Sequence, residues 1–491
     1  MARTPIRKGA PSATDKAPRA EEKRQIHRHV VNAAYMHKAA HLRTRQERSD
    51  AGKALRVTHP REAQAGFKAA PDRPDPIGLL IESSRGRIEH LVPIRYGRML
   101  ASPFAFYRGA AAIMAADLSD TASTGLGVQA CGDAHLANFG AFATPERRIV
   151  FDINDFDETF PAPWEWDLKR LAASFVIASA HNGHKPADGR AAAAAVVDRY
   201  AEKMREIAAL PTLDAWYGYL DYEALIEMGT DQELKRRRKK VLEKALDRNS
   251  AAEFIKLGHV KDGQPRIKDA PPLIYHANDL QDPAFEATVR DSLAAYRESL
   301  PAERRVLFDR YELADIAVKV VGVGSVGTTC AVALFFAAED DPLFLQVKEA
   351  RDSVLARYVD YPAYPSNGQR VVSGQRLMQA ASDVFLGHLV GADGRHFYVR
   401  QLRDVKVKPM IELFSAQNML GFARSTGWAL AGAHARSGDP AVIAGYIGKG
   451  EAFADAIAEF AVDYAKRNAQ DHAALIAAVR SGRVEAESEA D

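Results

Sequence analysis

Apolar and polar positions follow two different patterns along this chain. From residue 102 to about residue 210, apolar residues recur at spacings of three and four, which is typical of helices with one buried face. Trp164, Leu168, Leu171 and Phe175 share one such face. Residues 313–402 are instead rich in β-branched residues that glycines interrupt, which predicts strands and tight turns. The alanine-rich chain after residue 415 again predicts helices.

Shorter segments predict individual elements. An Asp262-Gly263 pair between two apolar runs indicates a hairpin turn. The expected elements are helices over residues 102–118, 164–180 and 375–386, strands over 128–131, 149–153 and 343–350, and hairpins over 259–267, 316–336 and 388–402.

Composition narrows the class of protein. The chain has 491 residues, 47% of them apolar, and a formal net charge of +2, which argues against binding nucleic acid or a membrane surface through bulk charge. No apolar run approaches the roughly 20 residues of a membrane span, and the charged N-terminus lacks the apolar stretch of a secretory signal. Cys131 and Cys330 lie far apart and predict neither a disulfide framework nor a zinc site, so we expect a cytoplasmic protein.

Residues suited to phosphoryl transfer cluster after two short apolar strands. Asp133, His135 and Asn138 lie within six positions, and Asp155 follows Asn138 by 17 residues. A phosphotransferase needs one carboxylate beside the accepting hydroxyl, to orient it or take its proton. It also needs carboxylate and amide oxygens that hold Mg²⁺ against the phosphates. The cluster therefore favours a phosphotransferase site over the alternative, a polar turn whose acids cap helices.

Asp152, Asp155 and Asp157 compete for the metal role. Positions two apart on a strand share a face, so Asp155 and Asp157 can both point at one ion. Asn138, Asp155 and Asp157 are therefore the candidate metal ligands.

A glycine-rich segment in the second half of the chain matches the pattern GxGxxG. The pattern alone is weak, because it also occurs in dinucleotide-binding folds, where the glycines open a helix. Here a β-branched and aromatic run follows, so we expect strand, glycine tip and strand, which is the phosphate-covering loop of kinases. Arginine also suits phosphate. The predicted nucleotide-binding residues are Gly322, Gly324, Ser325, Gly327, Thr328, Lys348 and Arg108, with Arg400 and Arg403 as further candidates.

These motifs resemble those of the aminoglycoside and choline phosphotransferases, a branch of the kinase-like superfamily. Residues 131–138 match the loop pattern H-G-D-x-H-x-x-N except that Cys131 replaces the first histidine, and Asp155-Phe156 matches the metal loop. The resemblance implies that Asp133 is the catalytic aspartate, that His135 supports the catalytic loop, and that Asp167 braces this loop from the next helix. It further implies that Asn138 and Asp155 are metal ligands, with Asp155 preferred over its neighbours because of its spacing to Asp167. It also implies that Lys348 pairs with the α- and β-phosphates of ATP.

The motifs together resemble the bacterial domain-of-unknown-function family 2252, from about residue 60 onward. Because the glycine loop follows the catalytic loop, we expect an α+β, two-lobed kinase-like fold that is circularly permuted. The expected regions are a disordered tail over 1–25, a helical extension over 26–95, a catalytic helical domain over 96–305, a β-rich nucleotide-binding domain over 306–412, and C-terminal helices over 413–491 that pack on the catalytic domain.

One departure from the kinase pattern concerns the acid that pairs with the strand lysine. The helix after Lys348 offers no glutamate, which leaves Glu349 or Asp352 as substitutes, or no pair. We expect an enzyme that uses ATP and Mg²⁺ to phosphorylate an unidentified hydroxyl-bearing acceptor. The alternatives are AMP transfer, a nucleotide-binding pseudokinase, and an NAD-dependent dehydrogenase.

Overall fold

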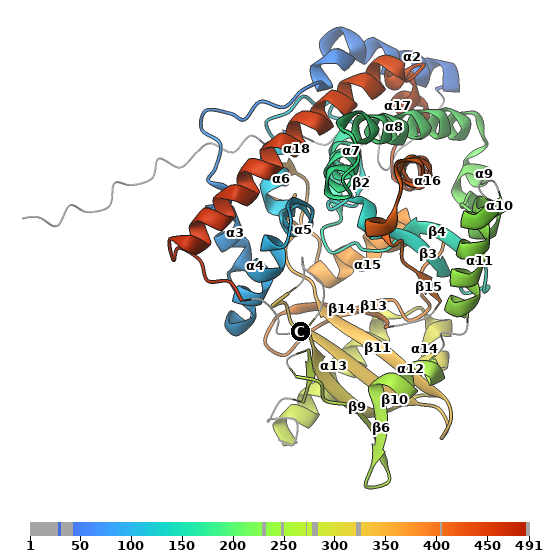
Figure 1. The fold of residues 1–491 in the computed structure, drawn as a ribbon. Coiled ribbons are helices and arrows are strands. Elements are labelled where there is room, and N and C mark those ends of the chain that lie inside the picture. The colour runs from blue at the N-terminus through green and yellow to red at the C-terminus, as the bar shows by residue number, and fades with distance from the viewer. Residues whose placement is uncertain are drawn as a thin grey trace, which may run out of the picture.

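The molecule combines helices with antiparallel sheets. A computed structural model describes residues 28–30, 43–227, 232–246, 250–271, 273–276, 283–320, 326–402 and 405–487. Most helices gather in residues 43–246 and 405–487, here called the helical unit, and the largest sheet lies in residues 250–402, the sheet unit (Figure 1). The mixed α+β class is confirmed. The tail predicted over residues 1–25 lies outside the described residues.

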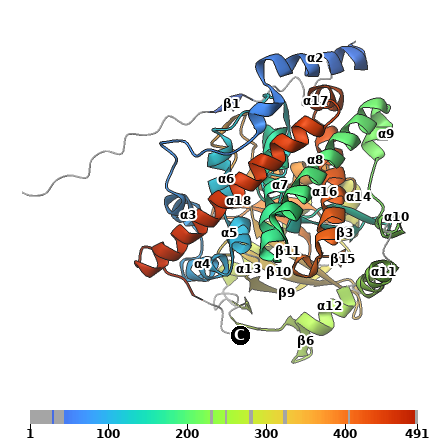
Figure 2. The same ribbon diagram turned by 45° about the horizontal axis from the view of Figure 1, so that its top comes forward.

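The helical unit packs around one central helix, α7 (Trp164–His181). It is surrounded by α8 (Pro186–Ala209), α16 (Ala416–Ser437) and α18 (Glu451–Arg480), and Figure 2 shows α18 crossing α7 and α8. α17 (Pro440–Ile447) packs on α2 (Arg45–Thr58), so both ends of the described chain contribute to this unit.

Helix α7 is buried on more sides than its apolar spacing predicted. The four residues of the expected buried face are fully buried, but so are Glu165, Asp167, Lys169 and Arg170, each at most 2% exposed. A helix with one apolar face would expose these charges to water. Here neighbouring elements cover every face, and the charged side chains bind loops instead.

Four short helices follow α2: α3 (Pro76–Ser84), α4 (Val92–Leu100), α5 (Pro103–Gly109) and α6 (Ala111–Leu118). The single helix expected over residues 102–118 is therefore wrong, because the chain breaks at Ala110. The Arg95 guanidinium donates a hydrogen bond of 3.0 Å to the Gly109 carbonyl, which takes that acceptor out of a continuous helical ladder.

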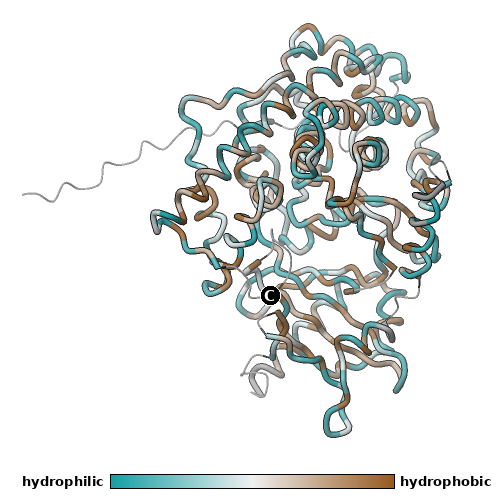
Figure 3. The backbone as a smooth tube through the Cα atoms, viewed as in Figure 1, coloured by the Kyte–Doolittle hydropathy of each residue, from teal (hydrophilic) through white to brown (hydrophobic). Residues whose placement is uncertain are grey.

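The largest sheet contains six antiparallel strands. Hydrophobic residues occur along several of these strands (Figure 3). Helix α13 (Pro283–Ser299) covers one face through Tyr296, and the opposite face packs partly on Phe254 of α12 (Ser250–Leu257). The strand order is β13 (Gly387–Val390), β14 (His396–Gln401), β11 (Pro342–Glu349), β10 (Cys330–Phe336), β9 (Glu312–Lys319) and β8 (Ile274–Tyr275).

The sheet unit begins earlier than the boundary expected at residue 306. Strand β8 pairs with β9, and the hairpin of β6 (Gly258–Lys261) and β7 (Gln264–Ile267) packs beside β9. Its turn has left-handed backbone at Asp262 and Gly263, as the sequence predicted. Residues 250–305 therefore belong with the sheet because their apolar side chains cover its two faces.

Two small sheets carry the loops between the units. β2 (Gly127–Ala130) pairs with β5 (Phe160–Pro163), and β3 (Phe139–Ala143) pairs with β4 (Ile149–Ile153) and β15 (Lys406–Val407). The strands predicted at residues 128–131 and 149–153 are present, the first shifted by one residue.

The helix predicted over residues 375–386 is only partly correct. Helix α15 (Asn367–Met378) starts at a serine cap, Ser366, and ends before Gln379. The Gln379 side chain then donates to the Ile153 carbonyl at 2.7 Å, and Asp383 accepts from the Gln401 amide, so these two polar residues join loops and strands. The pattern gave no sign of these distant partners.

The remaining helices are short or peripheral. They are α9 (Thr212–Tyr217), α10 (Tyr222–Glu227), α11 (Gln232–Leu246) and α14 (Ala302–Phe308). No helix among the described residues has the length and apolar character required to cross a bilayer.

Candidate functional site

A cavity of about 760 Å³ lies between the helical and sheet units. Its volume falls in the range of small-molecule sites. The Lys348 ammonium and the Asp155 carboxylate, from different units, approach to 3.9 Å. Eight of the residues predicted from the sequence line this cavity: Arg108, Asp133, His135, Asn138, Asp155, Asp157, Lys348 and Arg400. Arg403 lies outside the described residues.

The loop that carries Asp133 is anchored from α7. Asp167 accepts hydrogen bonds from the backbone amides of Cys131 and Gly132, at 2.6 and 2.9 Å. Nε2 of His434, on α16, lies 3.2 Å from Oδ2 of the same carboxylate. Nδ1 of this ring lies 2.9 Å from the hydroxyl of Tyr200, on α8. Three helices thus fix the start of the loop, at the position where Asp167 was expected to brace it. Sequence reasoning missed Tyr200 and His434, which are distant in the chain.

Gly132 is required by both conformation and space. Its φ of +80° lies in the left-handed region, and a Cβ there would stand 2.3 Å from the Glu158 carbonyl oxygen. The loop therefore turns directly against the segment that follows Asp155. This close approach brings two sequence motifs into one wall of the cavity.

Asp133 forms an ion pair with Arg170, whose Nε lies 2.7 Å from Oδ1. Burial raises the pKa of Asp133 to about 7, although the guanidinium favours the ionised form. His135 lies near the same carboxylate, with Nε2 3.8 Å from Oδ2. Burial, together with Arg170 and Arg108, holds the pKa of His135 well below its ordinary value, so the ring is neutral at pH 7. Arg170 follows Asp167 by three residues on α7, a spacing that could have revealed it.

Asn138 and Asp155 lie side by side because their loops are bonded together. The Asn154 amide donates to the Asn138 carbonyl at 2.8 Å, and the Cys131 thiol donates to the Asp155 carbonyl at 3.3 Å. Cys131, the departure from the histidine of the motif, therefore joins the two loops. Oδ1 of Asp155 is buried and accepts no hydrogen bond from the described residues. This oxygen has the Lys348 ammonium 3.9 Å away but no hydrogen bond, and in a cavity that Asn138 also lines it fits a hard cation such as Mg²⁺.

The other two competing aspartates have structural partners. Asp152 accepts from the backbone amides of Ile153 and Ala380, at 2.9 and 3.1 Å. Asp157 pairs with Lys348 and accepts from the Tyr398 hydroxyl at 2.6 Å. No group of three histidine, cysteine, aspartate or glutamate side chains suited to a metal occurs in the described part of the chain. The predicted metal ligands include only two such side chains, Asp155 and Asp157, and the amide of Asn138.

The partner of the strand lysine is Asp157, 191 residues away in sequence. Burial alone would raise the pKa of Asp157, but the Lys348 ammonium and the hydrogen bonds from Lys348 and Tyr398 hold it at about 2. Glu349 accepts instead from the Thr329 amide, so it does not pair with Lys348. Asp352 likewise accepts from the Asn367 side chain. The substitutes considered for the missing helix glutamate are therefore wrong.

Part of the predicted glycine loop lies outside the described residues, including Gly322, Gly324 and Ser325. Its flanking strands β9 and β10 pair antiparallel, which is unlike the strand-then-helix unit of a dinucleotide fingerprint. Gly327 accepts from the Ile88 amide at 2.7 Å. Thr328 lines a smaller neighbouring cavity of about 370 Å³, so the structure does not bring these two residues to the main cavity.

Residues 87–478 match the family described as "Uncharacterized protein conserved in bacteria (DUF2252)". The chain belongs to this family. The matched span contains the charged lining of the cavity, from Arg87 to Lys408. No curated protein and no solved structure matches the chain significantly.

The DUF2252 cavity is strongly basic, which sequence reasoning did not foresee. Ten lining side chains are cationic and four are anionic. The helices α3 to α5 and their loops contribute Arg87, Arg95, Arg98 and Arg108, and the rest of the chain contributes Lys256, Lys319, Lys348, Arg400, Lys406 and Lys408. Because they come from several segments that are far apart in the sequence, no single charge run marks them. Burial and the neighbouring Arg400 lower the pKa of Lys406 to about 7.

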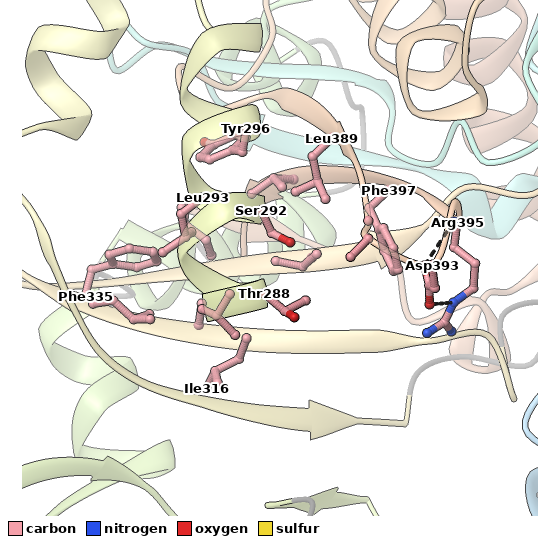
Figure 4. A pocket seen from close by; sticks show the side chains of 18 residues that line it. Thr288, Ser292, Leu293, Tyr296, Ile316, Phe335, Leu389, Asp393, Arg395 and Phe397 are labelled. Atoms are coloured by element: carbon pink, nitrogen blue, oxygen red, sulfur yellow. Dashed lines mark hydrogen bonds and ion pairs between the residues drawn. The ribbon is translucent and has the colours of Figure 1, made fainter. Parts of the chain in front are cut away.

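A second cavity of about 400 Å³ lies on the other face of the sheet, under α13 (Figure 4). Leu345 and Val347 of β11 face it, whereas Gln346 and Lys348 face the basic cavity, as strand alternation requires. Its lining is mostly apolar, and Asp393 pairs with Arg395 at its edge. In this DUF2252 chain the sheet therefore separates an apolar cavity from the basic cavity that Asp133, Asp155 and Lys348 line.

Proposed function

We propose that this chain is an ATP- and Mg²⁺-dependent phosphotransferase with a circularly permuted, two-lobed kinase-like fold. The observation that carries the proposal is the meeting of Lys348 with Asp155 and Asp157 across one cavity. A phosphate-binding lysine and metal-binding acids on opposite walls are the arrangement that phosphoryl transfer requires. The sheet unit would be the nucleotide-binding lobe and the helical unit the catalytic lobe.

The end of α16 supports the permutation. Ser437, the last residue of α16, accepts a hydrogen bond of 2.8 Å from the Gln129 amide in β2. A helix that leads directly into the catalytic loop in an unpermuted chain would end at this place. Here the same neighbourhood joins two segments 308 residues apart. Exposed chain ends make such a rearrangement tolerable.

The residues divide into three roles. Asp133 would take the proton of the acceptor hydroxyl, and a pKa raised by burial to about 7 suits a base near neutral pH. Asn138 and Asp155 would hold Mg²⁺, which would neutralise phosphate charge. Lys348, fixed by Asp157, and Arg400, which also lines the cavity, would bind the triphosphate.

The proposed transfer makes one bond to phosphorus and breaks another. The acceptor oxygen bonds to the γ-phosphorus of ATP while the bond to the β–γ bridging oxygen breaks. ADP leaves, and the hydroxyl proton passes to Asp133. Positioning and charge neutralisation account for most of the rate enhancement in reactions of this class.

Nucleotide binding tests the proposal directly. We expect ATP with Mg²⁺ to stabilise the wild-type protein, by about 2.7 kcal/mol at one hundred times the dissociation constant. D155N should lose the Mg²⁺-dependent part of this stabilisation, and K348A should lose most of it. Thermal shifts with ATP and with NAD, each with and without Mg²⁺, measure the effect.

The exposed residues Asp214 and Lys53 provide matched controls, D214N and K53A, which should behave like the wild type. Unchanged ATP affinity in both D155N and K348A would contradict the proposal. Product mass then separates phosphate addition from AMP addition, and ATP binding without any turnover would indicate a pseudokinase.

A further inference from the structure

Among the described residues, three arginines at one end of the basic cavity form no ion pair with a carboxylate, although the Glu158 carboxylate is near enough to oppose the lowering of the pKa of Arg87 and Arg95 by burial. Arg95 is 2% exposed, and its guanidinium donates only to Ser83, Ser84 and the Gly109 carbonyl. Arg87 donates to the Ser83 and Val326 carbonyls. Among the described residues, no ion pair joins either side chain to an acid. Buried cations without counterions are costly, so a bound anion would stabilise this arrangement.

Arg108 has still fewer contacts. Among the described residues its guanidinium makes no hydrogen bond or ion pair; its Nε is buried, and the Phe104 ring lies 5.9 Å away. Arg98, three residues after Arg95 on α4, lines the same end of the cavity. A planar guanidinium with unused donors suits the oxygens of a phosphate group.

The cluster lies beside the proposed base. Arg170, which pairs with Asp133, donates to the Tyr107 carbonyl at 3.2 Å, and Tyr107 directly precedes Arg108. Arg108 is also close enough to lower the pKa of His135. The groups proposed for the nucleotide, Lys348 and Arg400, come instead from the sheet unit. Arg108, and Arg95 through its hydrogen bond to the neighbouring Gly109 carbonyl, therefore stand beside the loop of Asp133, where the acceptor hydroxyl would be.

The charge of the cavity exceeds what the nucleotide neutralises. Ten basic and four acidic lining residues leave a formal excess of six positive charges. ATP with one Mg²⁺ carries two negative charges, fewer than this formal excess. The lining charge is therefore compatible with a second anion in the same cavity.

We infer that the acceptor is itself a small phosphorylated compound, whose phosphate group binds Arg108 and Arg95 while its hydroxyl faces Asp133. This inference rests on the proposed transfer reaction, and it names the substrate class. A hydroxyl compound without an anionic group would leave the arginine cluster unpaired.

Matched probes test this inference. Glycerol 3-phosphate and glucose 6-phosphate are titrated calorimetrically beside glycerol and glucose, with and without a saturating nonhydrolysable ATP analogue and Mg²⁺. We expect the two phosphorylated probes to bind, with and without the ATP analogue and Mg²⁺, and glycerol and glucose not to bind. R108Q should weaken this binding about tenfold or more, since a charged hydrogen bond is lost. R108K, which retains the charge without the planar fork, should fall between R108Q and the wild type.

The control is R190Q, which alters an arginine on the surface, 49% exposed and paired with Asp455. It should leave binding unchanged. The inference is overturned if no phosphorylated probe binds, if R108Q binds as tightly as R190Q, or if the ATP analogue displaces the probe. Phosphate binding that depends on Arg108, in a protein that binds no nucleotide, would contradict the transfer reaction alone.

Discussion

At the scale of single residues, the cavity divides its carboxylates between structure and chemistry. Asp152 and Asp167 bind backbone amides, Asp157 neutralises Lys348, and Asp155 keeps a buried oxygen without a hydrogen bond. All four aspartates lie between residues 152 and 167, so only their partners in space separate these roles. The candidate ligand is the carboxylate whose hydrogen-bonding capacity remains unused.

The Asp157–Lys348 pair predicts a pH-dependent contribution to stability. The folded-state pKa of Asp157, about 2, is below the ordinary value near 3.9, so ionisation favours the folded state. This contribution is complete above about pH 4 and is lost as the pH falls through about 2. D157N should cost about 3 kcal/mol at pH 7, because Lys348 loses its closest counterion in a buried site.

Denaturant unfolding of wild type and D157N between pH 7 and pH 2.5 measures this effect, and the difference should shrink as the pH falls. D309N is the control, because Asp309 forms an exposed pair with Arg297, and it should cost less than about 1 kcal/mol. A D157N penalty that stays constant to pH 2.5 would contradict the assigned ion pair.

Four of the site residues found from the sequence sit in one compact motif. Asp133, His135, Asn138 and Asp155 occupy two adjoining loops, so spacing alone grouped them. Arg95 and His434 were missed because their partners, Gly109 and Asp167, are reached only through tertiary packing. An isolated arginine or histidine in a helix carries no sign of such a partner.

At the scale of elements, α7 organises the site through its buried charges. Glu165 accepts from the Thr124 amide, Asp167 holds the start of the loop that carries Asp133, and Arg170 pairs with Asp133. Each side chain fixes a different loop, so one rigid helix orients several segments. Elements whose signals are local, such as the Asp262-Gly263 hairpin, could be predicted, whereas the end of α15 depends on distant partners of Gln379.

The turn at Gly132 predicts a measurable difference between two glycines. G132A should destabilise the protein by about 3 kcal/mol or more, because a left-handed alanine costs about 1–2 kcal/mol and its Cβ would collide with the Glu158 carbonyl. G183A has nearly the same φ, +75°, with nothing within 4 Å of its Cβ, so it should show the conformational cost alone.

Thermal and denaturant unfolding compare the two variants. If G132A and G183A are equally stable, the close approach between the two loops is absent. Because this approach places Asp133 beside the segment of Asp155, G132A should also reduce nucleotide binding, whereas G183A should not.

At the scale of the whole molecule, two units from interleaved parts of the chain enclose one basic cavity. The α+β class and the presence of a β-rich region could be predicted from hydrophobic periodicity. The earlier start of the sheet unit could not, because α13 and the β6–β7 hairpin are assigned only by the faces that they cover. The excess of positive charge was likewise invisible, since the net charge of the chain is only +2.

The most direct test of the central claim is the anomalous signal of Mn²⁺ in a crystal grown with a nonhydrolysable ATP analogue. The account predicts a manganese peak within coordination distance of Asp155, with the triphosphate between that ion and Lys348. A peak remote from Asp155, or an analogue bound outside the cavity between the two units, would contradict it.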